Sequence, residues 1–264
     1  MMRRFVVLML VSVFLMTLVG CQNNKDVVVE NTDTQIEDVT ETEIQTEEQT
    51  EAPYVDNGDD NSNNDEGESV EYYIEMYREV FDLHRTGLSE KWDMSQWMDK
   101  GLSGLNAYPF EAEPLKSVGY TIIDVDGDGV CEFVFGAIAG DEFVEKIIFE
   151  MYTLKDDKPV QVFVSHERNR YYLVKEEAGG YHIVNESSNG AANSAHYYYN
   201  LQDGELVLFQ GIVFDAFVDE ENPWFMTYDT DWDVSNDEPI SEELAEDVIR
   251  SYRNNYMKLD YIRL

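Results

Sequence analysis

The chain has 264 residues, with 55 Asp and Glu against 18 Lys and Arg, and its formal net charge is −37. Hydrophobic residues make up 43% and aromatic residues 13%, which excludes a wholly disordered chain. The charge excludes a nucleic-acid-binding protein, because contacts with phosphates need Lys and Arg. Two cysteines exclude a small domain built on a disulfide framework.

The first residues have the pattern of a targeting segment. Arg3 and Arg4 precede an uncharged apolar run, residues 5–19, which is shorter than the about 20 residues of a membrane-spanning helix. The run ends in Leu18-Val19-Gly20-Cys21, which resembles the bacterial lipobox. The resemblance implies that residues 1–20 are a lipoprotein signal peptide and that Cys21 becomes the lipidated N-terminus. The alternative is an ordinary cleavable signal peptide followed by an incidental cysteine.

Residues 21–69 are predicted to be the lipidated cysteine and a disordered acidic tether. Thr, Gln, Asn and Glu dominate this segment, and Lys25 is its one basic residue. Such a composition cannot bury enough apolar surface to offset the entropy of ordering. The mature protein is therefore expected at the extracytoplasmic face of the cell membrane, held there by lipid, facing the outside of the plasma membrane or the periplasm.

Two helices are predicted at the start of the remaining domain. Apolar residues recur at steps of three and four from Val70 to His84, which is the spacing of one helix face. Ser69 suits the N-cap of this helix, and Gly87 suits the position just beyond its end. A second helix is expected over residues 89–100.

From Ser117 onward the pattern changes to short strands. Val, Ile, Phe and Tyr are enriched in segments separated by short polar turns: 119–124, 130–139, 144–154, 159–165, 170–175, 181–186, 195–201 and 205–217. Short turns predict an antiparallel meander, because parallel strands need longer crossovers. Helical spacing returns over residues 241–255, capped by Ser241, and a last strand is expected within 256–264. We therefore expect residues 70–264 to form an α+β domain: a twisted antiparallel β-meander sheet of about seven to nine strands, with N-terminal helices and a C-terminal helix packed against it.

One motif carries recognisable chemistry, the segment from Asp124 to Glu132. Carboxylates stand at its positions 1, 3, 5 and 9, in Asp124, Asp126, Asp128 and Glu132, and Val130 at position 7 offers its backbone carbonyl. Calcium takes about six to eight such oxygen ligands, and carboxylates crowded this closely repel one another without a cation. We predict a structural Ca²⁺ site, in preference to Mg²⁺, which keeps more of its water. The alternative is a polar turn that uses Asp and Gly for its geometry.

The motif is not an EF-hand, because that template needs Glu at position 12, where this chain has Phe135. Its predicted strand flanks make it resemble the Asp-x-Asp-x-Asp-Gly-x-x-Asp/Glu calcium loop of integrin-type (FG-GAP) propeller repeats. Those proteins carry several tandem copies and this chain carries one, so the resemblance does not imply a propeller. The lipobox, acidic tether and single loop together resemble uncharacterised lipoproteins of Gram-positive, Clostridia-like bacteria, a resemblance that implies no particular activity.

Other motifs carry weaker signals. Asp229, Asp231 and Asp233 alternate in the same way, but Val234 stands where the glycine is needed, so a solvated acidic loop is favoured over a second metal site. The four histidines are scattered without metal-ligand spacing. Tyrosines 171, 172 and 197–199, with Trp224 and Trp232, offer an aromatic platform for sugars, but alternation in strands sends half of them into the core, and a core role is favoured.

The interpretation we adopt is a membrane-anchored binding or interaction module, not an enzyme. We expect a monomer whose membrane contact is the lipid and whose ligand is an unidentified protein or carbohydrate. The alternative is a hydrolase of cell-wall or extracellular glycan that uses a carboxylate pair, Asp215 with Asp229 or Asp231. A third hypothesis is an accessory subunit of a signalling or transport system.

Overall fold

A single antiparallel sheet of eleven strands organises the part of the chain that the structure describes. The structure is a computed structural model that describes residues 70–108, 114–140, 142, 144–176 and 179–264. The predicted signal peptide, lipidated Cys21 and tether therefore lie outside the described residues.

The sheet follows the chain almost in sequence order, as expected of a meander. Its order is β10-β9-β8-β7-β6-β5-β3-β2-β1-β11, with β4 paired to β3 beside this path, and each pair is antiparallel. The strands are β1 (Val118–Ile123), β2 (Glu132–Ala137), β3 (Ile148–Lys155), β4 (Lys158–Val164), β5 (Asn169–Lys175), β6 (Tyr181–Gly190), β7 (Asn193–Gln202), β8 (Glu205–Asp215), β9 (Trp224–Thr227), β10 (Glu238–Pro239) and β11 (Ile262–Arg263).

The predicted antiparallel sheet is confirmed, but the predicted strand number was too low. The strands that were missed, β9 and β10, are short and lie in a segment rich in Asp, Asn and Pro, where β propensity is low. Strand β10 contains Pro239, which a sheet tolerates at its edge because no neighbour needs the missing N–H. The last strand expected within residues 256–264 is present as β11.

Helices stand before and after the sheet in the sequence. They are α1 (Val70–Met76), α2 (Arg78–Glu90), α3 (Met94–Asp99), α4 (Pro114–Ser117) and α5 (Glu242–Arg253), with 3₁₀ turns η1 (Gly104–Ala107), η2 (Val144–Lys146) and η3 (Val234–Asn236). Helix α5 begins as predicted, because the Ser241 hydroxyl accepts a hydrogen bond from Leu244 N–H at 3.2 Å.

The segment expected to form one helix that ends before Gly87 is divided at Tyr77 into α1 and α2, and α2 continues past Gly87 to Glu90. Gly87 is required by packing: a β-carbon there would lie 2.4 Å from Cη2 of Trp97. The helix ends where Lys91 adopts the left-handed conformation, with φ of 54°. Gly87 thus allows the indole of Trp97 to approach the helix backbone.

The second helix was expected from residue 89 and instead begins at Met94. Asp93 and Gln96 form a reciprocal capping box, in which each side chain accepts the other residue's backbone N–H at 2.9 Å. This capping pair was visible in the sequence and was overlooked, because Ser89 was taken as the start.

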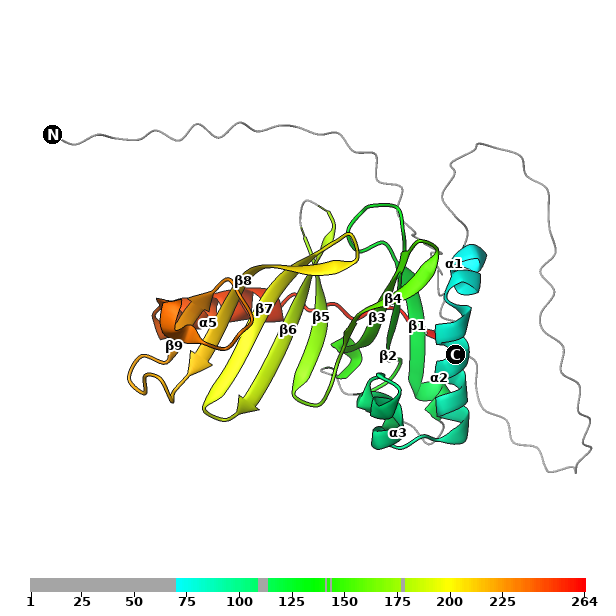
Figure 1. The fold of residues 1–264 in the computed structure, drawn as a ribbon, viewed down its shortest axis with the longest axis horizontal. Helices are drawn as coiled ribbons and strands as arrows, with labels where there is room; N and C mark the ends of the chain where they lie inside the picture. Colours follow the sequence, from blue (N-terminus) through cyan, green and yellow to red (C-terminus); the bar gives the residue numbers. More distant parts are fainter. Residues whose placement is uncertain (1–69, 109–113, 141, 143, 177–178) are drawn as a thin grey trace, which may run out of the picture. The chain divides into compact units, whose positions relative to one another are not determined.

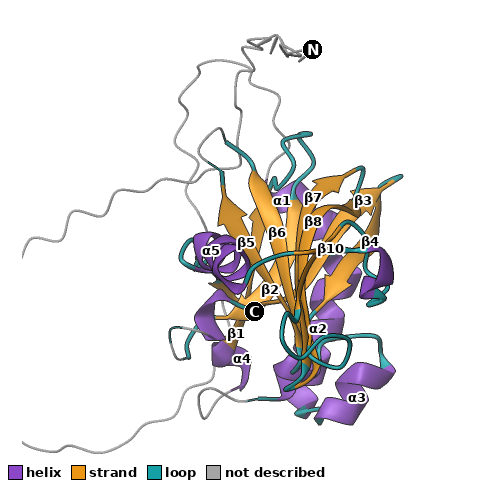
Figure 2. Cartoon of the chain, turned by 90° about the vertical axis from the view of Figure 1, so that its left-hand side faces the viewer, coloured by secondary structure: helices purple, strands orange, loops and turns teal. Residues whose placement is uncertain are grey.

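Alternation along the strands separates two cores on the two faces of the sheet. On β2, Phe133 and Phe135 belong to the core shared with the helices, whereas Val134 belongs to the other core. Helices α1, α2 and α5 all pack on the first face (Figures 1 and 2), and the ring of Tyr252 in α5 stacks on Tyr198 of β7 at 4.0 Å. We call this the helix face, and the opposite one the open face.

The C-terminal segment, residues 256–264, connects two strands that are far apart in the sheet. Tyr256 forms a bridge with Val174 of β5, and Met257 N–H donates to the carbonyl of Leu173 at 2.9 Å. The segment then reaches β1, where Arg263 of β11 pairs with Gly119. The end of the chain therefore links the middle of the sheet to β1.

A buried carboxylate joins the helices to the sheet. Glu150 of β3 has no solvent exposure, and one of its oxygens accepts from His84 Nε2 at 3.1 Å and from Ser103 N–H at 2.8 Å. Asn106 donates to the same oxygen at 2.9 Å, and the Tyr152 hydroxyl donates to the other at 2.5 Å. Burial alone would raise the pKa of Glu150, but the His84 charge and these hydrogen bonds outweigh it and lower the pKa.

His84 completes this ion pair. Its Nδ1 lies 2.8 Å from the Val80 carbonyl while Nε2 faces Glu150, so both ring nitrogens meet acceptors, which is the arrangement of an imidazolium. The ring also stacks on Phe135 at 3.6 Å.

Replacing Glu150 with Gln should lower the free energy of unfolding by about 3–5 kcal/mol, because it leaves the buried His84 without its counter-charge. Urea denaturation followed by tryptophan fluorescence measures this change. The matched control is Glu75→Gln, which removes an exposed ion pair with Arg78 and should change nothing measurable. In a double-mutant cycle with His84→Gln the two losses should be less than additive; additive losses would show that the pair is not coupled.

His196 of β7 makes stability depend on pH. Burial lowers its pKa to about 4, helped by the nearby Arg253 charge and opposed by Glu186, whose carboxylate lies 3.7 Å from Nδ1. Because the folded-state pKa is below the ordinary value of 6.5, protons bind preferentially to the unfolded chain as the pH falls between these values.

The free energy of unfolding of the wild type should therefore fall more steeply than that of His196→Gln between pH 6.5 and about 4, by a difference on the order of 3 kcal/mol. Urea denaturation of both proteins at several pH values in this window measures the difference. Equal pH slopes for the two proteins would contradict the assignment.

Candidate metal centre and ligand pocket

The predicted metal loop lies between β1 and β2 and is built on its first aspartate. The Asp124 carboxylate accepts Gly127 N–H at 2.7 Å through one oxygen and Gly129 N–H at 3.2 Å through the other. Both glycines have positive φ, 78° and 90°, and a β-carbon on either would meet no neighbouring atom. The glycines are therefore required by backbone conformation and not by space.

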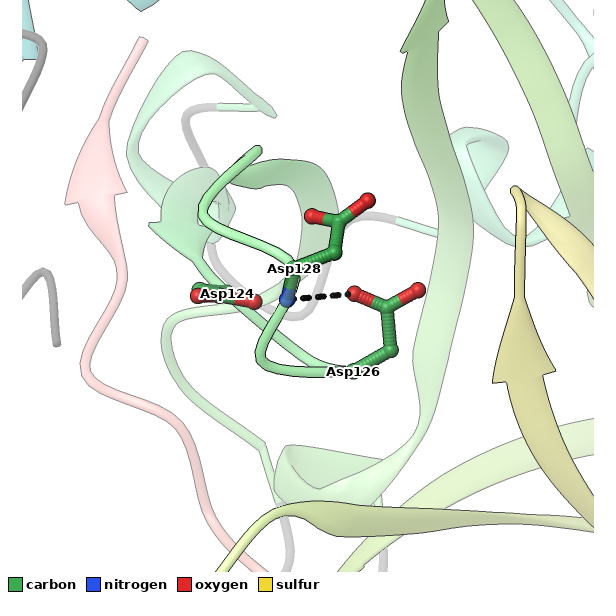
Figure 3. A group of neighbouring side chains, drawn as sticks. All are labelled: Asp124, Asp126 and Asp128. Atoms are coloured by element: carbon green, nitrogen blue, oxygen red, sulfur yellow. Dashed lines mark hydrogen bonds between the residues drawn. The ribbon is translucent and has the colours of Figure 1, made fainter. Parts of the chain in front are cut away.

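Three carboxylates of the loop come together. One oxygen from each of Asp124, Asp126 and Asp128 lies within 4.8 Å of the other two, and Figure 3 shows these side chains around the turn. Asp126 accepts Asp128 N–H at 3.3 Å, and Asp128 accepts Val130 N–H at 2.7 Å. Burial and the neighbouring charges of Asp128 and Asp124 raise the pKa of Asp126 to about 6. The group can hold a metal ion.

Glu132, the predicted ligand at position 9, lies beneath the loop. It is 1% exposed, and its two oxygens accept Val125 N–H at 2.8 Å and the Thr153 hydroxyl at 2.9 Å. Burial, with the charges of Asp126 and Asp124, raises the pKa of Glu132 to about 8, although both hydrogen bonds oppose the rise. Glu132 is not part of the three-carboxylate group, and ligation by it would require its carboxylate to exchange one of these hydrogen bonds for the metal.

Two tyrosines bind the backbone at the end of the loop. Their place in the sequence pattern indicated only a role in the core. The Tyr73 hydroxyl donates to the Gly129 carbonyl and the Tyr77 hydroxyl to the Cys131 carbonyl, both at 2.9 Å. These carbonyls flank Val130, the residue predicted to give its own carbonyl to the metal. Their spacing of four residues put them on one helix face, but nothing in the sequence indicated that this face meets the loop.

The second acidic segment has a different role. Asp231 accepts Asp233 N–H at 2.8 Å, and Asp233 accepts Ser235 N–H at 3.0 Å, so these carboxylates form consecutive turns. Within the described ranges, no metal-competent group includes these residues or a histidine. The turns hold Trp232 at φ of 65°, a left-handed conformation that is uncommon for a bulky residue.

Asp215, one member of the carboxylate pair suggested for a hydrolase, supports a turn. Asp215 is 7% exposed, and it accepts hydrogen bonds from the Asn193 side chain at 3.0 Å and from two backbone N–H groups, those of Phe217 at 2.9 Å and Val218 at 3.3 Å. Its oxygens therefore stabilise the turn after β8. Asp229 and Asp231 lie in the turns that precede η3.

The open face carries a pocket of about 460 Å³. It crosses β5, β6 and β7 and is bounded by the loop that holds Trp232. The aromatic residues that line it are Tyr171, Tyr197, Tyr199 and Trp232. Burial raises the pKa of Tyr197 to about 12, with contributions from Asp229, Asp237 and Asp231, so this hydroxyl is neutral at physiological pH.

The expectation that alternation divides the aromatic residues is confirmed. Tyr172 and Tyr198 belong to the helix-face core, and Trp224 packs against that same core. Tyr197 and Tyr199 lie in the open-face core and line the pocket. Nothing in the sequence distinguishes the half that lines a pocket, because both halves have the same period of two residues.

Comparisons of the chain with protein-family models, curated proteins and solved structures find no match. Among the described residues, no helix combines the length and the apolar character needed to span a membrane.

Proposed function

We propose that residues 70–264 form an extracytoplasmic binding module, stabilised by one calcium ion and anchored to the cell membrane through lipid on Cys21. The observation that carries the metal part is the convergence of Asp124, Asp126 and Asp128 within one loop. Calcium bound there would neutralise their repulsion and tie the end of β1 to the start of β2.

Calcium suits this loop better than magnesium. Three carboxylates, the Val130 carbonyl and water supply the hard oxygen ligands that calcium accepts in flexible geometry at about 2.3–2.6 Å. Magnesium demands a near-ideal octahedron and keeps several waters, for which a loop of this flexibility offers no advantage. Outside the cell, calcium near millimolar concentration fills even a site of the weak extracellular class.

Calcium should raise the melting temperature of the full chain by a few degrees, relative to EDTA. At about 2 mM calcium and a dissociation constant of about 10⁻⁴–10⁻³ M, the linked stabilisation is about 1–2 kcal/mol. Thermal melting followed by circular dichroism measures it. Asp128→Asn should abolish the shift, whereas Asp231→Asn, in the second acidic segment, should retain it. If only Asp231→Asn loses the shift, the metal binds at the second acidic segment and not at the predicted loop. If calcium does not shift the melting temperature of the wild type, the predicted loop is a polar turn without metal.

The module is proposed to bind rather than to catalyse. Asp215, which the hydrolase alternative invoked, accepts three hydrogen bonds that support the turn after β8. The open face instead offers a pocket whose volume is in the range of small-molecule sites, beside a sheet whose other face is filled by helices. We propose a monomer whose ligand enters from this face.

The lipid anchor is supported by the order of charged start, apolar run and Leu18-Val19-Gly20-Cys21 in the sequence. More than one acyl chain on Cys21 would make the anchor stable, since each buried CH₂ contributes about 0.8 kcal/mol.

Cys21→Ser should abolish incorporation of radiolabelled palmitate and shift the protein from the detergent phase to the aqueous phase in Triton X-114 partitioning. The wild-type chain, expressed in the same cells, is the control and should carry label and enter the detergent phase. A Cys21→Ser chain that still incorporates palmitate would contradict lipidation at this residue.

A further inference from the structure

We propose that the pocket on the open face is a carbohydrate site, in which a sugar ring packs on Trp232 and its hydroxyls bond the polar groups that line the pocket. This inference rests on the proposed binding function and names the chemical class of its ligand.

Trp232 supplies the partly exposed aromatic ring of the pocket. The rings of Tyr197 and Trp232 lie 6.3 Å apart and nearly perpendicular, at 89°, in an edge-to-face contact that supports the indole. Tyr197 and Tyr199 are 3% and 8% exposed, so Trp232 is the ring that a sugar can reach. Aromatic faces carry negative electrostatic potential, and the axial C–H groups of a sugar ring present the complementary positive edge.

The pocket contains buried polar atoms that lack a hydrogen-bond partner within the described part of the chain. They are the Tyr197 hydroxyl, Ser187 Oγ and His166 Nδ1. Tyr197 is the clearest case, because the whole residue is 3% exposed. An unsatisfied buried polar atom costs about 1–3 kcal/mol, so a ligand that gave these three atoms hydrogen-bond partners would recover part of that cost.

The loop at the pocket edge holds Trp232 under backbone strain. Its φ of 65° is maintained by the turns of Asp231 and Asp233, which accept the backbone N–H groups of Asp233 and Ser235. Strain of this kind costs about 1–3 kcal/mol and persists where the surrounding structure over-determines it, typically at ligand sites. The alternating aspartates thus position the side chain of Trp232.

The chemistry of the lining selects a polyhydroxylated ligand. Tyrosine and serine hydroxyls can each donate and accept a hydrogen bond, which is also the property of a sugar hydroxyl. No Asp or Glu lines the pocket, whereas Arg168 does, which disfavours a cationic ligand and favours a neutral or acidic sugar. A peptide cannot add as a strand here, because β6 is already paired with β5 and β7.

The test is isothermal titration calorimetry of the full chain in detergent micelles, in calcium and in EDTA. The probes are cellohexaose, chitohexaose, mannohexaose and a uronate-containing hexasaccharide. At least one should bind with a dissociation constant below about 1 mM. Trp232→Ala should weaken that binding at least about tenfold, and Tyr197→Phe, which removes only the hydroxyl, about fivefold.

The control is Phe217→Ala, which removes an aromatic ring that is 82% exposed and outside the pocket, and it should leave binding unchanged. Thermal melting of each variant verifies that it is folded. The proposal is overturned if no hexasaccharide binds the wild type at about 10 mM, or if folded Trp232→Ala and Tyr197→Phe bind as well as the wild type.

The calcium proposal and the carbohydrate proposal can be contradicted independently of each other. A wild type whose melting temperature rises in calcium but which binds no sugar overturns the carbohydrate inference and leaves the metal proposal intact. Sugar binding without any calcium-dependent shift supports the carbohydrate inference and overturns the metal proposal.

Discussion

The arrangement of this domain depends on one buried negative charge. Glu150 stands in β3, at the centre of the sheet, and its partners come from α2, from η1 and from β3 itself. A carboxylate without exposure is tolerated only when its oxygens are satisfied, so the helices cannot slide along the sheet without leaving it unpaired. The requirement for His84 fixes the position of α2 on the strands, and the stacking of His84 on Phe135 completes the contact.

This placement of the helices determines what each region of the sheet can do. Helix α1 and the start of α2 bring Tyr73 and Tyr77 to the exit of the aspartate loop, where they hold its carbonyls. The same helices pack on one face of the sheet, and the pocket lies on the other face.

The sequence allowed the class of fold, the antiparallel pairing and the convergence of Asp124, Asp126 and Asp128 to be predicted, because these depend on local periodicity and spacing. The helix end at Gly87 was predicted wrongly, because Gly87 makes room for the Trp97 ring, a contact that only the tertiary structure reveals. The start of the next helix was placed at residue 89 although the capping pair at Asp93 and Gln96 could be read from the sequence. A contact between residues far apart in the sequence, such as the one that Tyr73 makes with the aspartate loop, leaves no recognisable pattern in the local sequence. The place of Glu132 beneath the loop could not be read from spacing either, because position 9 suits a ligand and a supporting residue alike.

The C-terminal segment has a consequence for the order in which the sheet is completed. Strand β1 is formed early in the chain, yet its outer neighbour, β11, lies at residues 262–263. Until residues 262–263 have left the ribosome, Gly119 and Tyr120 of β1 lack these strand partners, and an open edge is a template for pairing with other chains. This contact across more than half of the sequence is therefore a late step in forming the sheet, and loss of residues 262–263 would expose an edge that favours aggregation.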